Sequence, residues 1–119
     1  MTSTAEHTPR GGDRLTPVEV SLIEGQAWEA LRTVYDPEIP VNICELGLIY
    51  AVKAGEDGVV HIRMTLTTPH CPAAQSMPGE ITQKVKGIPR VADARVEVVW
   101  DPPWHPGLMS EAARLELGL

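Results

Sequence analysis

The sequence contains no phenylalanine and only five other aromatic residues, three Trp and two Tyr. A hydrophobic core must therefore be built from Val, Ile, Leu, Ala and Met. The hydrophobic fraction of 43% suffices for one modest core, and a chain of 119 residues suits one domain.

Basic residues are also scarce. Ten Lys and Arg residues face sixteen Asp and Glu residues, which gives a formal net charge of -6. This balance argues against a nucleic-acid partner and against docking on anionic lipid, because both require a basic surface. No apolar run approaches the roughly 18–20 residues of a membrane span, and the polar N-terminus lacks the apolar core of a secretory signal. We therefore expect a cytoplasmic protein without a membrane or nucleic-acid partner.

The chain has two cysteines, Cys44 and Cys71, which lie 27 positions apart and form no CxxC pair. This spacing argues against a disulfide framework and against a complete metal site within one chain. The sequence also lacks a Gly-rich phosphate loop, GxSxG and HExxH, so it gives no support for NTP binding or the standard hydrolase mechanisms.

The patterning predicts a disordered tail over residues 1–15 and one domain over residues 16–119. Thr16, Pro17 and Glu19 form a helix-start signal with a capping box. An apolar stripe at spacings of three and four continues from there to Val34, and the Asp36-Pro37 pair ends the helix.

Strands are predicted over residues 48–54 and 59–66, joined by a turn at 55–58, and over residues 91–100. A second helix is expected over 72–86, and a last helix is expected from Ser110 to Gly118. The order α-β-β-α-β-α predicts a two-layer α/β (α+β) sandwich with a small three-stranded mixed sheet.

Cys71 is the strongest candidate for chemistry. It lies between a strand end and a helix start, where free backbone amides and the helix dipole stabilise a thiolate. A thiolate suits metal ligation, sulfur transfer or nucleophilic attack. The alternative is a buried, inert cysteine that fills space, which is also the interpretation we favour for Cys44.

Other polar side chains are candidates to line such a site. Asp36 and Glu38 are paired carboxylates on a proline-stiffened loop and suit acid/base work or a hard cation, although a structural clamp explains them equally well. His70 adjoins Cys71, and Thr67 is one of several threonines at the strand end. Threonines in such places are more often strand and turn formers.

Three segments together resemble one family. They are residues 31–50, which contain the DPE loop, residues 64–72, which contain the LTTP turn before Cys71, and residues 101–118. Over residues 16–119 the chain resembles the SufT-type metal–sulfur (iron–sulfur) cluster assembly family.

The resemblance implies the small α/β fold and a role as an accessory factor in iron–sulfur protein maturation, as part of the SUF system, without enzyme activity. It implies that Cys71 is the functional thiol, and that Asp36 and Glu38 line the same site. One thiol per chain cannot fill the coordination of a cluster. We therefore expect no permanent cofactor, but a transient iron–sulfur cluster with Cys71 as a metal ligand shared between chains.

The expected partners are the iron–sulfur assembly machinery, client apoproteins and a second copy in a homodimer. The main alternative is a protein–protein adaptor that uses the acidic surface and the Trp104 loop, with a purely structural Cys71. A thiol redox enzyme is a third hypothesis, weakened because no resolving cysteine lies nearby in the sequence.

Overall fold

The computed structural model describes residues 14–36, 39–67 and 73–118. Most of the tail predicted to be disordered, residues 1–13, lies outside these ranges. Leu15 is buried, and its amide donates to the carbonyl oxygen of Glu56 at 2.8 Å. The Nε of Arg14 binds the carboxylate of Glu56 at 2.8 Å. The contacts of the fold therefore start ahead of the first helix, at the turn between the first two strands.

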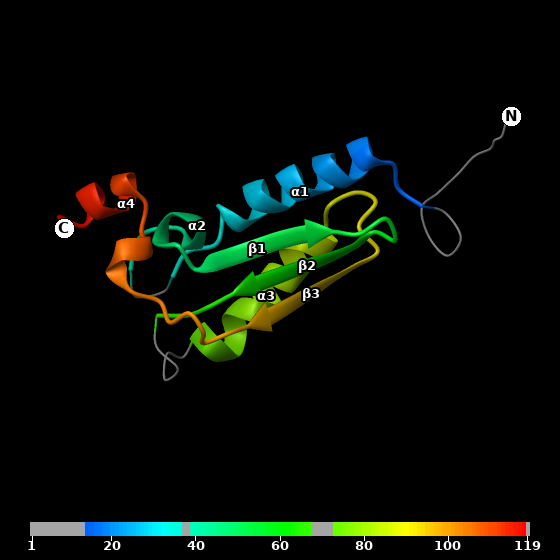
Figure 1. Ribbon diagram of the computed structural model, residues 1–119. Helices are drawn as coiled ribbons and strands as arrows, with labels where there is room; N and C mark the ends of the chain where they lie inside the picture. Colours follow the sequence, from blue (N-terminus) through cyan, green and yellow to red (C-terminus); the bar gives the residue numbers. More distant parts are fainter. Residues whose placement is uncertain (1–13, 37–38, 68–72, 119) are drawn as a thin grey trace, which may run out of the picture.

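The elements follow the predicted order, with two short additions (Figure 1). They are α1 (Pro17–Leu31), α2 (Ile43–Leu46), β1 (Ile49–Ala54), β2 (Val59–Met64), α3 (Ala73–Lys86), β3 (Asp93–Val98), the 3-10 turn η1 (Pro106–Leu108) and α4 (Glu111–Glu116). The additions are α2 and η1, both too short to show helical periodicity in the sequence.

Helix α1 begins at the predicted capping box. The hydroxyl of Thr16 accepts a hydrogen bond from the Glu19 amide at 3.2 Å, and the Glu19 carboxylate accepts one from the Thr16 amide at 2.8 Å. The predicted end at Asp36-Pro37 is wrong, because the helix stops at Leu31. Val34 continues the apolar stripe and is fully buried, but it lies outside the helix, where its carbonyl accepts from the Ile43 amide at 2.9 Å.

The sheet has the order β1-β2-β3 and is mixed, as predicted. Strands β1 and β2 form an antiparallel hairpin closed by a bond from the Gly55 amide to the Val59 carbonyl at 2.9 Å, whereas β2 and β3 are parallel. The strands are shorter than predicted. The alternation of apolar and charged residues from Ala92 onward predicts Trp100 on the buried face of the third strand. Because the strand stops earlier, Trp100 follows the end of β3 and is 45% exposed.

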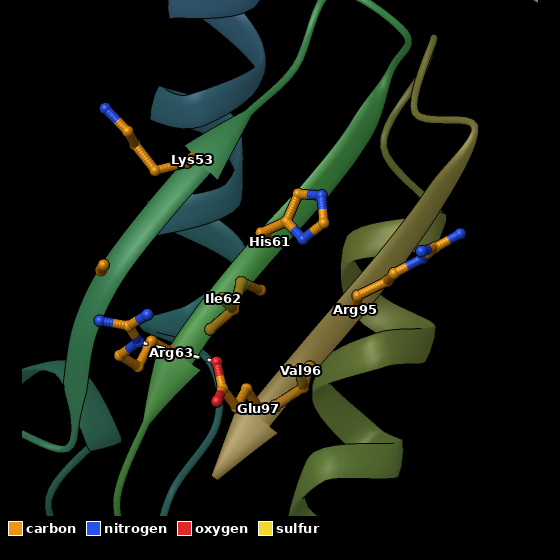
Figure 2. Close-up of a pocket in the computed structure, with 8 residues that line it drawn as sticks. Lys53, His61, Ile62, Arg63, Arg95, Val96 and Glu97 are labelled. Carbon is orange, nitrogen blue, oxygen red and sulfur yellow. Dashed lines mark ion pairs between the residues drawn. The ribbon is translucent and has the colours of Figure 1, made fainter. Parts of the chain in front are cut away.

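Helix α3 makes the crossover between the two parallel strands and packs on β3 and α1. Met77, Ile81 and Val85, which the sequence spaces by four residues, form its buried stripe, and Pro78 lies inside the helix. Helices α1 and α3 lie on the same side of the sheet (Figure 2), so no helix among the described residues packs on the opposite face. The two-layer prediction is therefore confirmed.

The core lies between these two layers. Helices α1 and α3 and the central strand β2 contribute fully buried side chains to it, such as Leu31, Ile81 and Ile62. In the described part of the chain, every apolar side chain of the buried core is aliphatic or Met, as the shortage of aromatic residues predicted. Within the described ranges, no helix combines the length and the apolar character that crossing a membrane would require.

The segment after β3 returns to α2. The Trp104 indole Nε1 donates to the Leu46 carbonyl at 2.7 Å, and the Ser110 amide donates to the Glu45 carbonyl at 2.8 Å. Gly47 follows α2 with φ of +81°, and a Cβ at this position would overlap the backbone carbonyl of Leu108. The two segments therefore touch backbone to backbone.

Candidate functional site

The predicted site residues divide between described and undescribed parts of the chain. Asp36 and Thr67 are described, whereas Glu38, His70 and Cys71 lie outside the described residues. The chain places Cys71 in the connection that leaves the carboxyl end of β2 and enters α3. The described residues around this connection therefore define the surroundings of Cys71.

Asp36 is buried, with 5% of its surface exposed. Its Oδ1 accepts a hydrogen bond from the Ile39 amide at 3.1 Å, and its own amide lies 3.5 Å from the Val41 carbonyl. Next to it, Tyr35 and Asn42 form an isolated antiparallel bridge. These contacts hold residues 39–42 against residues 35–36, an arrangement that we call the Asp36 turn. Asp36 thus makes the contacts of a structural clamp, one of the two roles considered for it from the sequence.

A hollow of about 340 Å³ opens beside this turn. It lies between the turn, α2 and α4, and its lining includes Tyr35, Glu45 and Glu116. Tyr35 is 58% exposed, so this ring faces outward rather than into the core. The hollow gives the Asp36 turn an accessible and acidic surface.

Thr65 is the first residue after β2. It is fully buried, its amide donates to the Leu48 carbonyl at 2.8 Å, and its hydroxyl has no hydrogen-bond partner in the described part of the chain. A buried hydroxyl without a partner costs free energy and requires an explanation. Thr67, two residues on, is half-buried. The threonines thus lie where the chain leaves the core toward Cys71.

The topology brings these segments to one end of the sheet. Strands β2 and β3 are parallel, so both finish at the end where β1 starts and where α2 follows the Asp36 turn (Figure 1). The Thr65–Leu48 bond joins the end of β2 to the residue that leads from α2 into β1. In open α/β sheets, ligands bind beyond the carboxyl ends of parallel strands. This end is therefore the candidate site.

Cys44 lies in α2 and is half-buried. The pKa of the Cys44 thiol is raised to about 11, chiefly by burial. The Arg32 guanidinium opposes this rise, and the Glu45 carboxylate adds to it. The thiol is therefore protonated at neutral pH and a poor nucleophile or ligand. This agrees with the prediction that Cys44 is a small core residue.

The described residues hold no group of three or more His, Cys, Asp or Glu side chains arranged to bind a metal ion. The Nδ1 of His105 accepts a hydrogen bond from the Gly107 amide at 3.1 Å and so caps η1. His61 alternates with apolar neighbours, which predicts an outward position, and it is exposed on the open face of the sheet. Neither histidine is therefore part of a metal site in the described region.

A large rigid aromatic such as Trp104 is suited to packing on the core or on a second subunit. Trp104 packs against the core, and its indole bond to Leu46 anchors the loop internally. The sequence did not predict that Lys53, His61 and Arg95 lie side by side across the open face. The outward positions of the strands are visible in the sequence, but the pairing register that makes these residues neighbours is not.

Comparison with known proteins identifies the family. Residues 24–98 match the family model described as iron–sulfur cluster assembly protein. The chain is 50% identical over 88 residues to an Fe-S protein maturation auxiliary factor of Porphyromonas gingivalis, a match that covers 74% of this chain and 84% of that one. It is 37% identical over 86 residues to the Fe-S protein maturation auxiliary factor SufT of Staphylococcus aureus, which covers 72% of this chain and 98% of the relative.

Among solved structures, the fold is similar to a Bacillus anthracis domain titled as a domain of unknown function, DUF59. The TM-score is 0.79 at 36% identity, and the match covers 87% of this chain and 99% of that one. The matched residues span the Asp36 turn, both cysteines and all three strands of the sheet. The chain therefore belongs to the iron–sulfur cluster assembly protein family, and the SufT-type resemblance inferred from its motifs is confirmed.

Proposed function

We propose that this protein is an accessory factor in iron–sulfur cluster assembly or delivery to client proteins, and that the thiol of Cys71 is its working group. The accessory role is supported by the names of its relatives, which are auxiliary factors of Fe-S protein maturation. The proposal includes the absence of an enzymatic reaction and a cytoplasmic location, where the SUF machinery and the client apoproteins are synthesised.

The observation that supports Cys71 is the contrast between the two cysteines. Cys44 has a thiol whose pKa is raised to about 11 by burial, so it is suited to packing. Cys71 lies in the connection between the carboxyl end of β2 and the start of α3. Backbone amides and the helix dipole favour a thiolate at such a position.

The proposed chemistry is transient handling of a cluster or its sulfur. A cluster takes four ligands, mostly cysteine thiolates, and one Cys71 per chain supplies only one of them. We therefore propose a site completed by a second copy in a homodimer or by the client. Asp36, Glu38, Thr67 and His70 are proposed to line this site, with Asp36 held in position by its turn.

The second candidate is an adaptor that binds partners while Cys71 is structural. The observation that favours it is the sheet face on which no described helix packs, which offers a partner surface away from the Asp36 turn. A thiol redox enzyme is less well supported, because Cys44, the other thiol, has a raised pKa and makes a poor resolving cysteine.

The deciding experiment compares Cys71→Ser with Cys44→Ser as a matched control. Each variant replaces the native gene, and the activity of a client iron–sulfur enzyme in cell extracts is measured. The thiol proposal predicts loss with Cys71→Ser and wild-type activity with Cys44→Ser. Normal maturation with Cys71→Ser would favour the adaptor.

A second measurement tests the cluster itself. The purified protein is incubated anaerobically with iron and sulfide, and its absorbance and its mass in solution are recorded. The carrier proposal predicts a visible absorption band on a dimer that Cys71→Ser abolishes. An adaptor shows no band with either protein. If the band is present in the variant as well, Cys71 is not the ligand.

A further inference from the structure

The open face of the sheet carries a row of three basic side chains. The strand register places Lys53 of β1 directly opposite His61 of β2, and His61 opposite Arg95 of β3. Figure 2 shows these side chains on three neighbouring strands, with α1 and α3 behind the sheet. Lys53 and Arg95 are therefore separated by one histidine and by no carboxylate in that row.

The row brings two cationic side chains, those of Lys53 and Arg95, onto one face of the sheet, two strands apart with His61 between them. Lys53 and His61 have no ion pair within the described ranges, whereas Arg95 lies 3.4 Å from Asp93 on its own strand. The chain has ten Lys and Arg residues against sixteen Asp and Glu residues. Enough carboxylates thus exist to balance this row, yet none is placed in it.

The face is hollowed at the row. A hollow of about 440 Å³ is lined by Lys53, His61, Arg95 and the Arg63–Glu97 pair, whose charged atoms lie 3.7 Å apart. The Arg63–Glu97 and Arg95–Asp93 pairs are both at the surface, where an ion pair contributes only about 0–1 kcal/mol. An incoming carboxylate can therefore displace the existing partners at little cost.

A second hollow continues from the first, because Ala51 and Arg63 line both. It measures about 640 Å³ and is lined largely by apolar side chains, among them Ile49, Pro103 and Leu108. One wall is held in place, since the Tyr50 hydroxyl donates to the Pro102 carbonyl at 2.7 Å. A charged hollow and an apolar hollow thus lie end to end on one face.

We propose that this face binds an acidic segment of a partner protein that carries an apolar side chain next to its carboxylates. The carboxylates lie over the Lys53–His61–Arg95 row, and the apolar side chain enters the hollow beside Leu108. A second copy of this chain fits less well, because a twofold contact would bring two such basic rows together. The inference goes beyond the proposed role of Cys71 and does not depend on it.

Binding is tested with a fluorescein-labelled peptide of about ten residues, which spans roughly 30 Å when extended. The peptide consists of Asp and Glu around a central pair of Leu, and its anisotropy is followed as the full chain is added. The face variant combines Lys53→Glu with Arg95→Glu. The control variant combines Lys84→Glu on α3 with Arg114→Glu on α4, which changes the net charge equally at exposed sites outside this face. Far-UV circular dichroism checks that each variant is folded.

The proposal predicts saturable binding that weakens at least about tenfold in the face variant and at high salt, and by less than about twofold in the control. Replacing the Leu pair by Ser should weaken binding as well. Absence of binding to the wild type at millimolar protein, or equal loss in both variants, would overturn the proposal. Equal binding of a Lys-rich peptide would do so too, and tighter binding of a single-stranded oligonucleotide would point to nucleic acid instead.

Should the face variant fail to fold, the single changes Lys53→Gln and Arg95→Gln test the same row. In either case, backbone amide shifts of isotope-labelled wild type during the peptide titration should concentrate in β1, β2 and β3. Shifts confined to α1 or α3 would contradict the proposed surface.

Discussion

The indole Nε1 of Trp104 donates a hydrogen bond of 2.7 Å to the backbone carbonyl of Leu46, 58 positions earlier in the chain. Leu46 is the last residue of α2 and is fully buried. The bond is reinforced nearby, where the Ser110 hydroxyl donates to the Glu45 carboxylate. Together these contacts hold the C-terminal segment against α2, at the end of the sheet where the candidate site lies.

Replacing Trp104 by Phe should lower the free energy of unfolding by about 1–3 kcal/mol, because the ring is retained but the Leu46 carbonyl loses its donor. Urea titration monitored by far-UV circular dichroism measures the change. Trp100→Phe is the control, since Trp100 is 45% exposed, and we expect a shift within about 0.5 kcal/mol. Equal effects of the two changes would refute the anchoring role of Trp104.

Asn42→Ala should destabilise the protein by about 1 kcal/mol. The Asn42 side-chain oxygen accepts bonds from the Cys44 and Glu45 amides, both at 3.0 Å, and so caps α2. Asn42→Asp keeps the acceptor and should stay close to the wild type. Thermal unfolding of the three proteins side by side gives the comparison, and a destabilised Asp variant would show that more than the cap is involved.

Acidification should remove a contribution of Glu19. The hydrogen bond from the Thr16 amide, aided by the Arg90 guanidinium at 2.7 Å, holds the pKa of the Glu19 carboxyl below its usual 4.5. Because the pKa is lower in the folded state, ionised Glu19 stabilises the fold above pH 4.5. This stabilisation is lost as the pH falls through the lower, folded-state pKa. The loss of stability between about pH 7 and pH 3 should therefore be smaller in Glu19→Gln than in the wild type.

Urea midpoints at the two pH values test this. Glu80→Gln, an exposed change on α3, serves as the control and should lose as much stability on acidification as the wild type. If Glu19→Gln behaves like this control, the capping box does not carry the pH dependence.

Cys44 should resist alkylation in the folded protein. With its pKa raised to about 11 by burial, the thiolate fraction at neutral pH is below that of an ordinary thiol by a factor on the order of a hundred. Iodoacetamide labelling followed by peptide mass spectrometry should modify Cys71 first and Cys44 only at high pH or in urea. Rapid labelling of Cys44 at neutral pH would show that its thiol is neither buried nor protonated as described.

Thr65→Val should raise the free energy of unfolding by about 1 kcal/mol, because the hydroxyl is buried and has no partner among the described residues. We expect the same variant to mature client enzymes less well, since a polar group kept at a cost to stability commonly serves a site. Thr67→Val, at a half-buried position, is the control and should not gain stability. A destabilised Thr65→Val would show that the hydroxyl has a structural partner.

The sequence predicted an element well where hydrogen bonds between residues close in the chain define it. The capping box of α1 spans four residues, so Thr16 and Glu19 identify it without knowledge of the fold. The end of α1 was placed too late because Val34 keeps the helical spacing of buried residues after the helix has stopped. Its burial comes from the packing of the next turn, which periodicity does not distinguish from helix.

The parts that escaped prediction depend on contacts between distant residues. Helix α2 has four residues and is held by Asn42 and by the returning Trp104 segment. The basic row on the open face depends on the pairing register of three strands, which could not be predicted from the sequence. For the candidate site, the sequence located Cys71 between a strand and a helix. The structure adds, at the same end, the buried Asp36 turn and the buried hydroxyl of Thr65, which has no partner among the described residues.

The position of Gly47 limits which substitutions the protein can tolerate. Its left-handed backbone and its contact with the Leu108 carbonyl leave no room for any side chain. A mutational scan should therefore show Gly47 to be as intolerant as the buried leucines around it, although it contributes almost no apolar surface. Sequence drift in the C-terminal segment is limited in the same way, because its path must continue to fit against a bare stretch of backbone.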